Sequence, residues 1–287
     1  MTDTQTTTRP PIPPTSNGNG TALNIILAVI GALVILTLLI SSARSAFATL
    51  SRENSTQSAD IAGVTNLEIS AGSGRFDLHF AKVQEATLEV DSSDSQEWQL
   101  KREGNKLSVD SPDSWGNWCF FGCSSYENKA VLTLPESMND GSMAAYFDLS
   151  AGELDAVGSY KNLEVEVGAG SLDLSGTAKN AKVQIGAGDA EVSLEDVEQA
   201  DFDISAGQLQ GTLSGKAPKQ INAEVSAGSL ELELPDVTYD LRQDVSAGDV
   251  SNKLATDMDS PNKISVNVSA GNATFHPQDS GPGPWNN

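Results

Sequence analysis

Histidine and the recognisable motifs of catalysis are scarce in this chain of 287 residues. It contains His79 and His276 and no other histidine, and strand-like alternation around His79 points that imidazole outward. G-x-S-x-G, a phosphate-binding glycine loop and H-E-x-x-H do not occur. The paired carboxylates of a glycosidase would need aromatic side chains beside them for the substrate to stack on, and the repetitive half of the chain has almost none. We therefore predict no enzymatic activity, no catalytic residues and no cofactor.

Positive charge is also in short supply. The chain has 17 Lys and Arg residues against 39 Asp and Glu residues, which gives a net charge of -22 at pH 7. Nucleic-acid binding depends on contacts between phosphates and Lys or Arg side chains. This imbalance argues against nucleic acid as a partner.

Cysteine and tryptophan are few and concentrated in one segment, residues 111–128. Both cysteines, Cys119 and Cys123, and two of the four tryptophans lie there. In an oxidising compartment a C-x3-C pair most simply forms a disulfide, whereas two thiolates alone cannot complete a tetrahedral zinc site, so we expect no metal. The segment either caps an open end of the fold or anchors a partner through its aromatic side chains. The candidate partner-binding residues are Trp115, Trp118, Phe120 and Phe121.

What the chain does contain is a repeated tripeptide, Ser-Ala-Gly or Gly-Ala-Gly. Successive copies are 18, 18, 19, 21, 20 and 23 residues apart, and an outlying copy begins at Ser70. A nearly fixed period of this length indicates a repeat architecture in which each unit buries its apolar face against its neighbours. The copies begin at Ser150, Gly168, Gly186, Ser205, Ser226, Ser246 and Ser269.

Apolar and polar residues alternate on both sides of each tripeptide, which indicates strand, turn and strand. An aliphatic residue such as Leu149 or Val167 precedes it, and another such as Leu154 or Leu172 follows its glycine by two positions. We predict an all-β, single-stranded β-solenoid with repeats of about twenty residues. The glycine is expected to adopt positive φ and the alanine to point inward. A β-sandwich of hairpins is the alternative.

The outward positions form a second pattern that is rich in Asp and Glu. One column lies two positions before the tripeptide, as at Asp148 and Glu166, and another lies three positions after its glycine, as at Asp155 and Asp173. In coils stacked roughly 4.8 Å apart, like charges along each column are close together. The columns either form a solvated face that keeps the sheet soluble, or bind divalent cations or a cationic partner.

A long uncharged stretch occurs only near the N-terminus, at Leu23–Ile40. Its eighteen residues suit a membrane span, whereas a cleavable signal peptide is the alternative because Ala46-Phe47-Ala48 has the small-x-small form. The predicted organisation is a disordered tail at 1–21, a transmembrane helix at 22–43, a polar linker at 44–60, a β-solenoid at 61–277 with the aromatic insertion at 111–128, and a flexible tail at 278–287.

The tripeptide series, reached through Leu134-Pro135 and Phe147-Asp148-Leu149, resembles the bacterial putative-adhesin domains of unknown function known as toastrack domains. The resemblance covers about residues 61–277 and implies a β-solenoid. It further implies membrane tethering and a place among cell-envelope stress systems of the phage-shock type. It supplies no catalytic residues, and the aromatic insertion departs from the family pattern.

We therefore predict a single-pass protein of the cell membrane that displays an acidic β-solenoid outside the cytoplasm. Its expected partners are the lipid bilayer, through residues 22–43, and either another membrane protein or a surface glycan. The predicted role is non-catalytic binding or scaffolding at the cell envelope, including the sensing of envelope stress. The alternatives are a surface adhesin that binds polysaccharide or another cell surface, and a structural solenoid that polymerises end to end.

Overall fold

The computed structural model describes residues 53–92, 98–111 and 129–278, all within the compact unit that begins at Arg52. These residues form strands joined by turns, together with one short 3-10 turn, η1 (Glu136–Met138). The all-β expectation is confirmed for this part of the chain.

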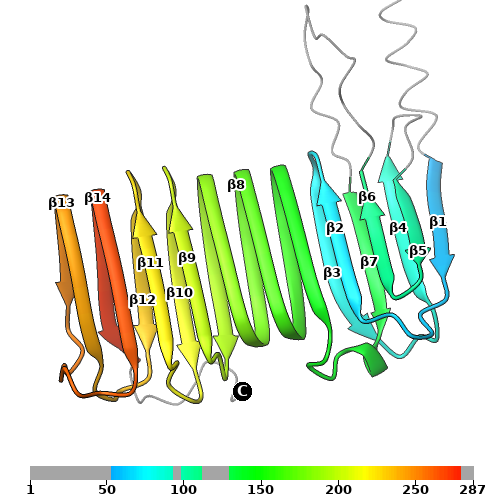
Figure 1. Ribbon diagram of the computed structural model, residues 1–287. Coiled ribbons are helices and arrows are strands. Elements are labelled where there is room, and N and C mark those ends of the chain that lie inside the picture. The colour runs from blue at the N-terminus through cyan, green and yellow to red at the C-terminus, as the bar shows by residue number, and fades with distance from the viewer. Residues whose placement is uncertain (1–52, 93–97, 112–128, 279–287) are drawn as a thin grey trace, which may run out of the picture. The chain divides into compact units, whose positions relative to one another are not determined.

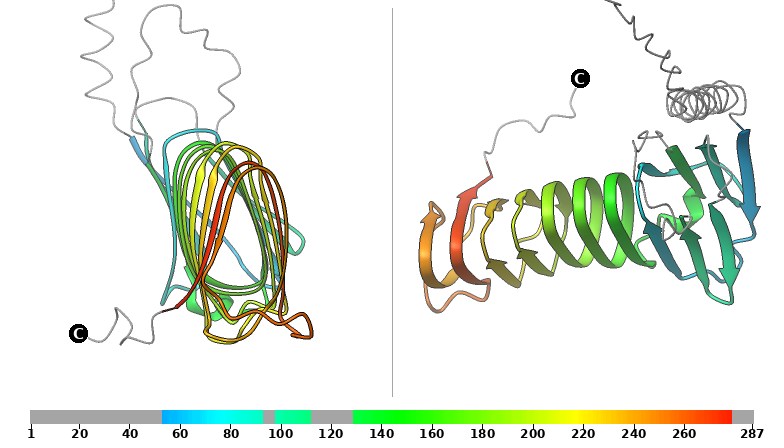
Figure 2. Two further views of the ribbon diagram at one scale, coloured as in Figure 1. Left: turned by 90° about the vertical axis from the view of Figure 1, so that its left-hand side faces the viewer. Right: turned by 90° about the horizontal axis from the view of Figure 1, so that it is seen from above.

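The chain winds into flattened coils, and each coil contributes one segment to each of two faces (Figure 1, Figure 2). The first face contains β2 (Asn66–Ala71), β6 (Lys106–Asp110), β9 (Gln199–Ile204) and β11 (Gln220–Val225). The second face contains β3 (Arg75–Ala81), β7 (Lys129–Pro135), β10 (Gln208–Ser214) and β12 (Ser229–Leu234). Three strands turn corners and belong to both faces: β8 (Ala144–Glu195), β13 (Asp240–Asn252) and β14 (Lys263–Pro277).

Aliphatic side chains form continuous columns inside the coils, as predicted. In the coils that carry the tripeptide, neighbouring strands are parallel and in register, so that Leu209 pairs with Ala190 on one side and Leu230 on the other. Stacking of equivalent residues removes their apolar surface from water, which is the main stabilising contribution. The residues that precede the tripeptide are at most 2% exposed in six copies: Leu149, Val167, Ile185, Ile204, Val225 and Val268.

The tripeptide glycines form a column of their own, in which backbone meets backbone. A Cβ atom at Gly170 would lie 2.2 Å from the carbonyl oxygen of Gly152, and one at Gly188 would lie 2.2 Å from that of Gly170. Positive φ occurs at Gly152, Gly170 and Gly248 but not at the other tripeptide glycines. The prediction of positive φ therefore holds for three copies, and close approach of successive coils is the requirement that all seven share.

The prediction that the tripeptide alanine points inward is wrong. At the corner the glycine backbones occupy the space between successive coils, and the aliphatic residues on either side already fill the interior. The alanine Cβ therefore turns toward solvent in most copies, while Ala71 of the outlying copy is buried and Ala151 is half-buried. The exposed alanines are Ala169, Ala187, Ala206, Ala227, Ala247 and Ala270.

The predicted fold class, a single-stranded β-solenoid preceded by a transmembrane helix, needs correction because the sheet is mixed. β1 (Glu53–Ala59) and β4 (Ala86–Ser92) pair with each other, and β4 with β7, in antiparallel fashion. β5 (Gln99–Glu103) pairs antiparallel with β6. These strands cover one end of the parallel stack, whose hydrogen-bonding edge would otherwise be open.

The coils are also not stacked in the order of the chain. β2 and β3 lie between β8 on one side and β6 and β7 on the other. At the opposite end, β14 lies between β11 and β12 on one side and β13 on the other (Figure 1). Most coils have the same alternation of inward apolar and outward polar residues, so many of them could pack as neighbours. The spacing of the tripeptides therefore predicts the length of a coil but not the order in which the coils stack.

The expected transmembrane helix is the other correction to the fold class. The described residues contain no helix that is long and apolar enough to cross a membrane. Residues 22–43 lie outside them, as do the expected tail at 1–21 and residues 279–287 of the expected tail at 278–287. The described chain begins instead in a strand, β1, within the range that we predicted as a polar linker.

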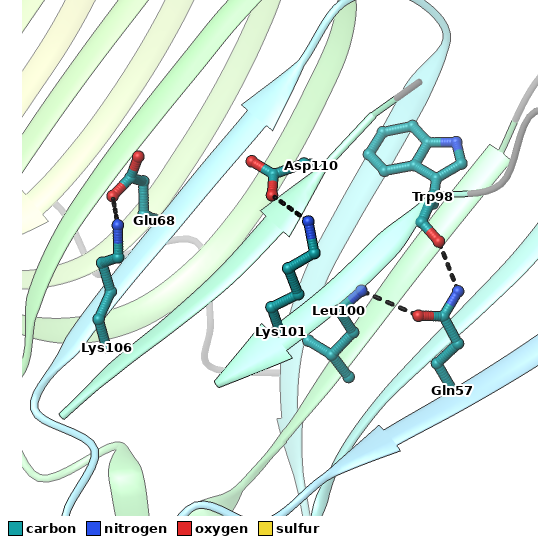
Figure 3. A network of polar contacts seen from close by, with 7 residues as sticks. All are labelled: Gln57, Glu68, Trp98, Leu100, Lys101, Lys106 and Asp110. Carbon is teal, nitrogen blue, oxygen red and sulfur yellow. Dashed lines mark hydrogen bonds and ion pairs between the residues drawn. The ribbon is translucent and has the colours of Figure 1, made fainter. Parts of the chain in front are cut away.

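Side-chain contacts fasten the covered end of the stack (Figure 3). The side-chain amide of Gln57 in β1 donates to the carbonyl oxygen of Trp98 and accepts a hydrogen bond from the amide of Leu100 at 2.9 Å. Trp98 is 1% exposed, and its ring centroid lies 5.5 Å from that of Phe76. Gln57 thereby joins the second-face strand β1 to β5 on the first face.

Candidate functional site

The residues singled out from the sequence, the cysteine pair and the aromatic side chains, lie in residues 112–128, outside the described part of the chain. They are Cys119, Cys123, Trp115, Trp118, Phe120 and Phe121. The point at which the segment departs is described. The amide of Ser111 donates to the carbonyl oxygen of Ser70 at 2.9 Å, and its hydroxyl accepts from the amide of Gly72 at 2.7 Å. Ser111 therefore lies beside the tripeptide corner of the outlying copy, directly after β6.

Among the described residues, the strongest candidate for a binding site is a groove across the first face, which we call the Tyr146 groove. It has a volume of about 340 Å³ and crosses β2, β6, β8 and β9. Ala144 pairs with Asn66 of one neighbouring coil, and Asn162, eighteen residues later, is the equivalent residue of the other neighbouring coil. The methyl group of Ala144 therefore lies between two positions that carry side-chain amides. This small side chain helps to hollow the face. The residues that matter most in the groove are Tyr146, Asn162, Glu164, Asn180 and Lys182.

Hydrogen bonds between neighbouring coils hold the side chains of the groove in place. Asn180 donates from Nδ2 to Oδ1 of Asn162 at 2.8 Å, and Nζ of Lys182 lies 2.7 Å from Oε1 of Glu164. These contacts follow from the repeat, because residues eighteen apart in sequence are separated by one strand spacing. The groove thus has ordered donors and acceptors that remain accessible to a ligand.

The same pattern continues toward the covered end of the stack. Nζ of Lys106 in β6 lies 2.8 Å from Oε2 of Glu68 in β2, and both side chains line the groove (Figure 3). Exposed ion pairs of this kind add little to stability. Their effect here is to alternate positive and negative groups along the groove, within a face that is otherwise acidic.

Tyr146 is the aromatic side chain of the groove. Burial, followed by the negative charges of Glu166 and Asp148, raises the pKa of the phenol to about 12. Tyr160 and Tyr239, the other tyrosines of the described ranges, are buried. Tyr146 was not among the candidates predicted from the sequence. It could have been found, because it is an aromatic residue at an outward position of the repeat and has acidic neighbours one coil away.

The two acidic columns predicted from the sequence do lie on the outer faces. Asp148, Glu166 and Asp203 line one hollow on the first face, and Asp155 and Asp173 line another on the second. Burial raises the pKa of the Asp155 carboxyl, and neighbouring carboxylates raise it further. Within the described ranges, no group of three or more His, Cys, Asp or Glu side chains is arranged to hold a metal ion.

Basic side chains accompany several of these acids. Arg75 forms an ion pair with Glu153, and Nζ of Lys129 lies 2.6 Å from Oδ2 of Asp77. The acidic faces are therefore partly neutralised near the covered end of the stack. A uniform ladder of like charge is not what the fold presents there.

Comparison with known proteins identifies a family. The family model described as Toastrack DUF4097 matches residues 64–278. No curated protein matches the chain.

Several solved structures are similar in fold. A putative cell adhesion protein from Clostridium sporogenes is 11% identical, with a TM-score of 0.37, and the alignment covers 79% of this chain and all of that one. A putative adhesin from Bacteroides fragilis is 15% identical, with a TM-score of 0.45 and coverage of 79% and 98%. A putative adhesin from Parabacteroides merdae is 9% identical, with a TM-score of 0.32 and coverage of 78% and 96%. Likeness at these values supports no argument about function.

Proposed function

The chain belongs to the Toastrack DUF4097 family, and we propose that it is a non-catalytic binding module of the cell envelope whose Tyr146 groove holds a hydroxyl-rich ligand, a surface glycan. The observation that carries this proposal is the combination of an aromatic ring with fixed amide, carboxylate and ammonium groups in one groove. Sugar hydroxyls both donate and accept hydrogen bonds, and each of these side chains can complement them. A groove that crosses several coils also suits an extended chain better than a compact small molecule.

Several further features support this proposal. The volume of the groove, about 340 Å³, lies near the lower end of the usual range for ligand sites. The Asn180–Asn162 and Lys182–Glu164 contacts order these side chains before a ligand arrives. Pre-ordering of this kind lowers the entropic penalty of binding. Envelope-stress sensing, which the family resemblance implies, would use the same groove as its input.

We expect Tyr146→Ala to weaken binding to a glycan by about thirtyfold, because aromatic anchors dominate binding energy. The measurement is binding of the full chain to an array of bacterial surface polysaccharides, followed by titration with the best ligand. Tyr146→Phe keeps the ring and removes the hydroxyl, which separates stacking from hydrogen bonding. Asp155→Asn, on the second face, is the matched control and should bind as the unaltered protein does. Equal affinity of Tyr146→Ala, or no binding to any polysaccharide, would contradict the proposal.

We also propose that the described domain lies outside the cytoplasm, at the cell membrane. The acidic, serine-rich surface supports this location. We expect protease added to intact cells to remove the domain, as detected with an antibody to residues of the second face. Survival of the domain in intact cells, together with its digestion in lysed cells whose wall has been removed, would argue for an inward-facing domain.

A further inference from the structure

The end of the stack opposite the antiparallel strands leaves apolar residues incompletely covered. β13 is the outermost strand there (Figure 1), and among the described strands it pairs with β14 alone. Val245 is 37% exposed, whereas its equivalents in the other tripeptide copies are at most 2% exposed. Leu241 is half-buried, and Gln243 between them is exposed. We call residues 241–245 the free edge.

The hydrogen bonds of β13 show which backbone groups face away from the stack. The amide of Asp240 donates toward β14, to the carbonyl oxygen of Asn262 at 2.8 Å, and the amide of Tyr239 donates the other way, to Ala255 at 2.9 Å. Successive residues of a strand direct their backbone groups to alternate sides. The N–H and C=O groups of residues 241, 243 and 245 therefore point to the open side, where no described strand meets them.

We propose that two copies of this protein associate through the ends of their stacks that carry β13. Their free edges pair in antiparallel fashion about a two-fold axis at Gln243. In this register Gln243 lies opposite Gln243 of the second copy. Leu241 lies opposite Val245, and Arg242 lies opposite Asp244, each contact occurring twice by symmetry. The free edge is thus complementary to itself in both charge and hydrophobicity, which is what an isologous interface requires.

Charge selects this register over its neighbours. Centring the pair on Arg242 would place Arg242 opposite itself and Asp240 opposite Asp244, and centring it on Asp244 would place that aspartate opposite itself. Like charges directly opposite each other are destabilising in antiparallel sheets. Centring on Leu241 would require Tyr239 to pair, but the backbone of Tyr239 is already hydrogen-bonded to residues 255 and 257.

Backbone geometry favours the same arrangement. Because residue 243 directs both its N–H and its C=O outward, the two copies of Gln243 exchange a pair of hydrogen bonds at the axis. Leu241 and Val245 of the second copy do the same on either side. Arg242 already pairs with the buried Asp240 at 3.0 Å, and its guanidinium keeps further donors for Asp244 of the second copy. Pairing would cover Val245 as it is covered in the other coils.

The test is sedimentation equilibrium of the full chain in a non-ionic detergent at about 0.15 M salt, where screening limits the repulsion between two acidic copies. We expect a monomer–dimer equilibrium for the unaltered protein. Gln243→Pro removes an amide that has no hydrogen-bonding partner among the described residues of its own copy, so the variant should fold normally and remain monomeric. Thermal unfolding checks that the fold is intact.

Two substitutions of opposite charge at Gln243, on the two-fold axis, test the proposed register. Gln243→Glu and Gln243→Lys each place like charges opposite each other and should weaken self-association roughly tenfold. An equimolar mixture of the two variants should form a mixed dimer at least as tightly as the unaltered protein does.

The proposal is overturned if the unaltered protein stays monomeric up to its solubility limit, or if Gln243→Pro dimerises normally. Failure of the mixed dimer to form would overturn it too. Open-ended filaments in place of dimers would show head-to-tail assembly instead. None of these outcomes depends on glycan binding at the Tyr146 groove.

Discussion

Replacement of Gly188 by alanine is expected to destabilise the stack of coils by about 3 kcal/mol or more, or to prevent it from folding. The new Cβ would lie 2.2 Å from the carbonyl oxygen of Gly170 and 2.9 Å from its nitrogen. Both atoms belong to backbone that is held in a hydrogen-bonded ladder, so neither can move without separating two coils. The measurement is the midpoint of urea or thermal unfolding followed by circular dichroism.

Gly63→Ala is the matched control for this prediction. Gly63 has φ of +74° and no atom within 4 Å of its hypothetical Cβ, so alanine there meets a conformational penalty but no clash. That penalty is about 1–2 kcal/mol. At Gly188 φ lies outside the left-handed region, so the loss there isolates the effect of close approach. Equal losses for the two variants would show that the glycine column does not control the coil spacing.

Replacement of Phe275 by alanine is expected to lower the free energy of unfolding by about 3–5 kcal/mol. Phe275 is fully buried in β14, where it pairs with Leu232 of β12 on one side and Asn252 of β13 on the other. Alanine would leave a cavity in the coil that joins β13 to the rest of the stack. Hydrogen exchange should show the greatest loss of amide protection in β13 and β14, because β13 has no other partner among the described strands.

His276→Ala is the control for Phe275, because the two residues are adjacent in one strand and point to opposite faces. The imidazole of His276 lies on the second face, with Nε2 3.1 Å from Oε1 of Glu231, and its side chain is 21% exposed. Its removal should change the free energy of unfolding by less than about 1 kcal/mol. A loss at His276 that equals the loss at Phe275 would mean that the outer face, and not the core, holds β14 in place.

The inward and outward columns of side chains could be predicted, because apolar and polar residues alternate in every repeat. Leu149 and Val167 were expected inside and Asp148 and Glu166 outside, and the structure places all four accordingly. Period-two alternation fixes the face of each residue once a strand forms. The orientation of the alanine was not predictable in the same way, since at a corner the alternation is interrupted and backbone contacts between coils decide which way Cβ points.

The candidate groove was not predicted from the sequence, because residues of several neighbouring coils form it. Tyr146, Asn162 and Lys182 belong to different coils, and their proximity depends on which coils are adjacent. Within β8, coils that are consecutive in the chain are also neighbours in space. The part of the groove that β8 forms could therefore have been predicted from the outward-facing residues of the repeats. Lys106 and Glu68 could not have been added, because β6 and β2 are neighbours only through the rearranged order of the first coils.

The sequence by itself determined that the repetitive part of this chain forms strands, the length of its coils, the residues that line its interior and the acidity of its faces. Each of these is a local consequence of alternation, glycine placement and composition. Only the tertiary structure decided the stacking order, the antiparallel cover at one end, the free edge at the other and the position of the groove. Coils with the same alternation offer nearly the same backbone edge to any neighbour, so the choice among neighbours is made by packing of the whole stack and not by any one repeat.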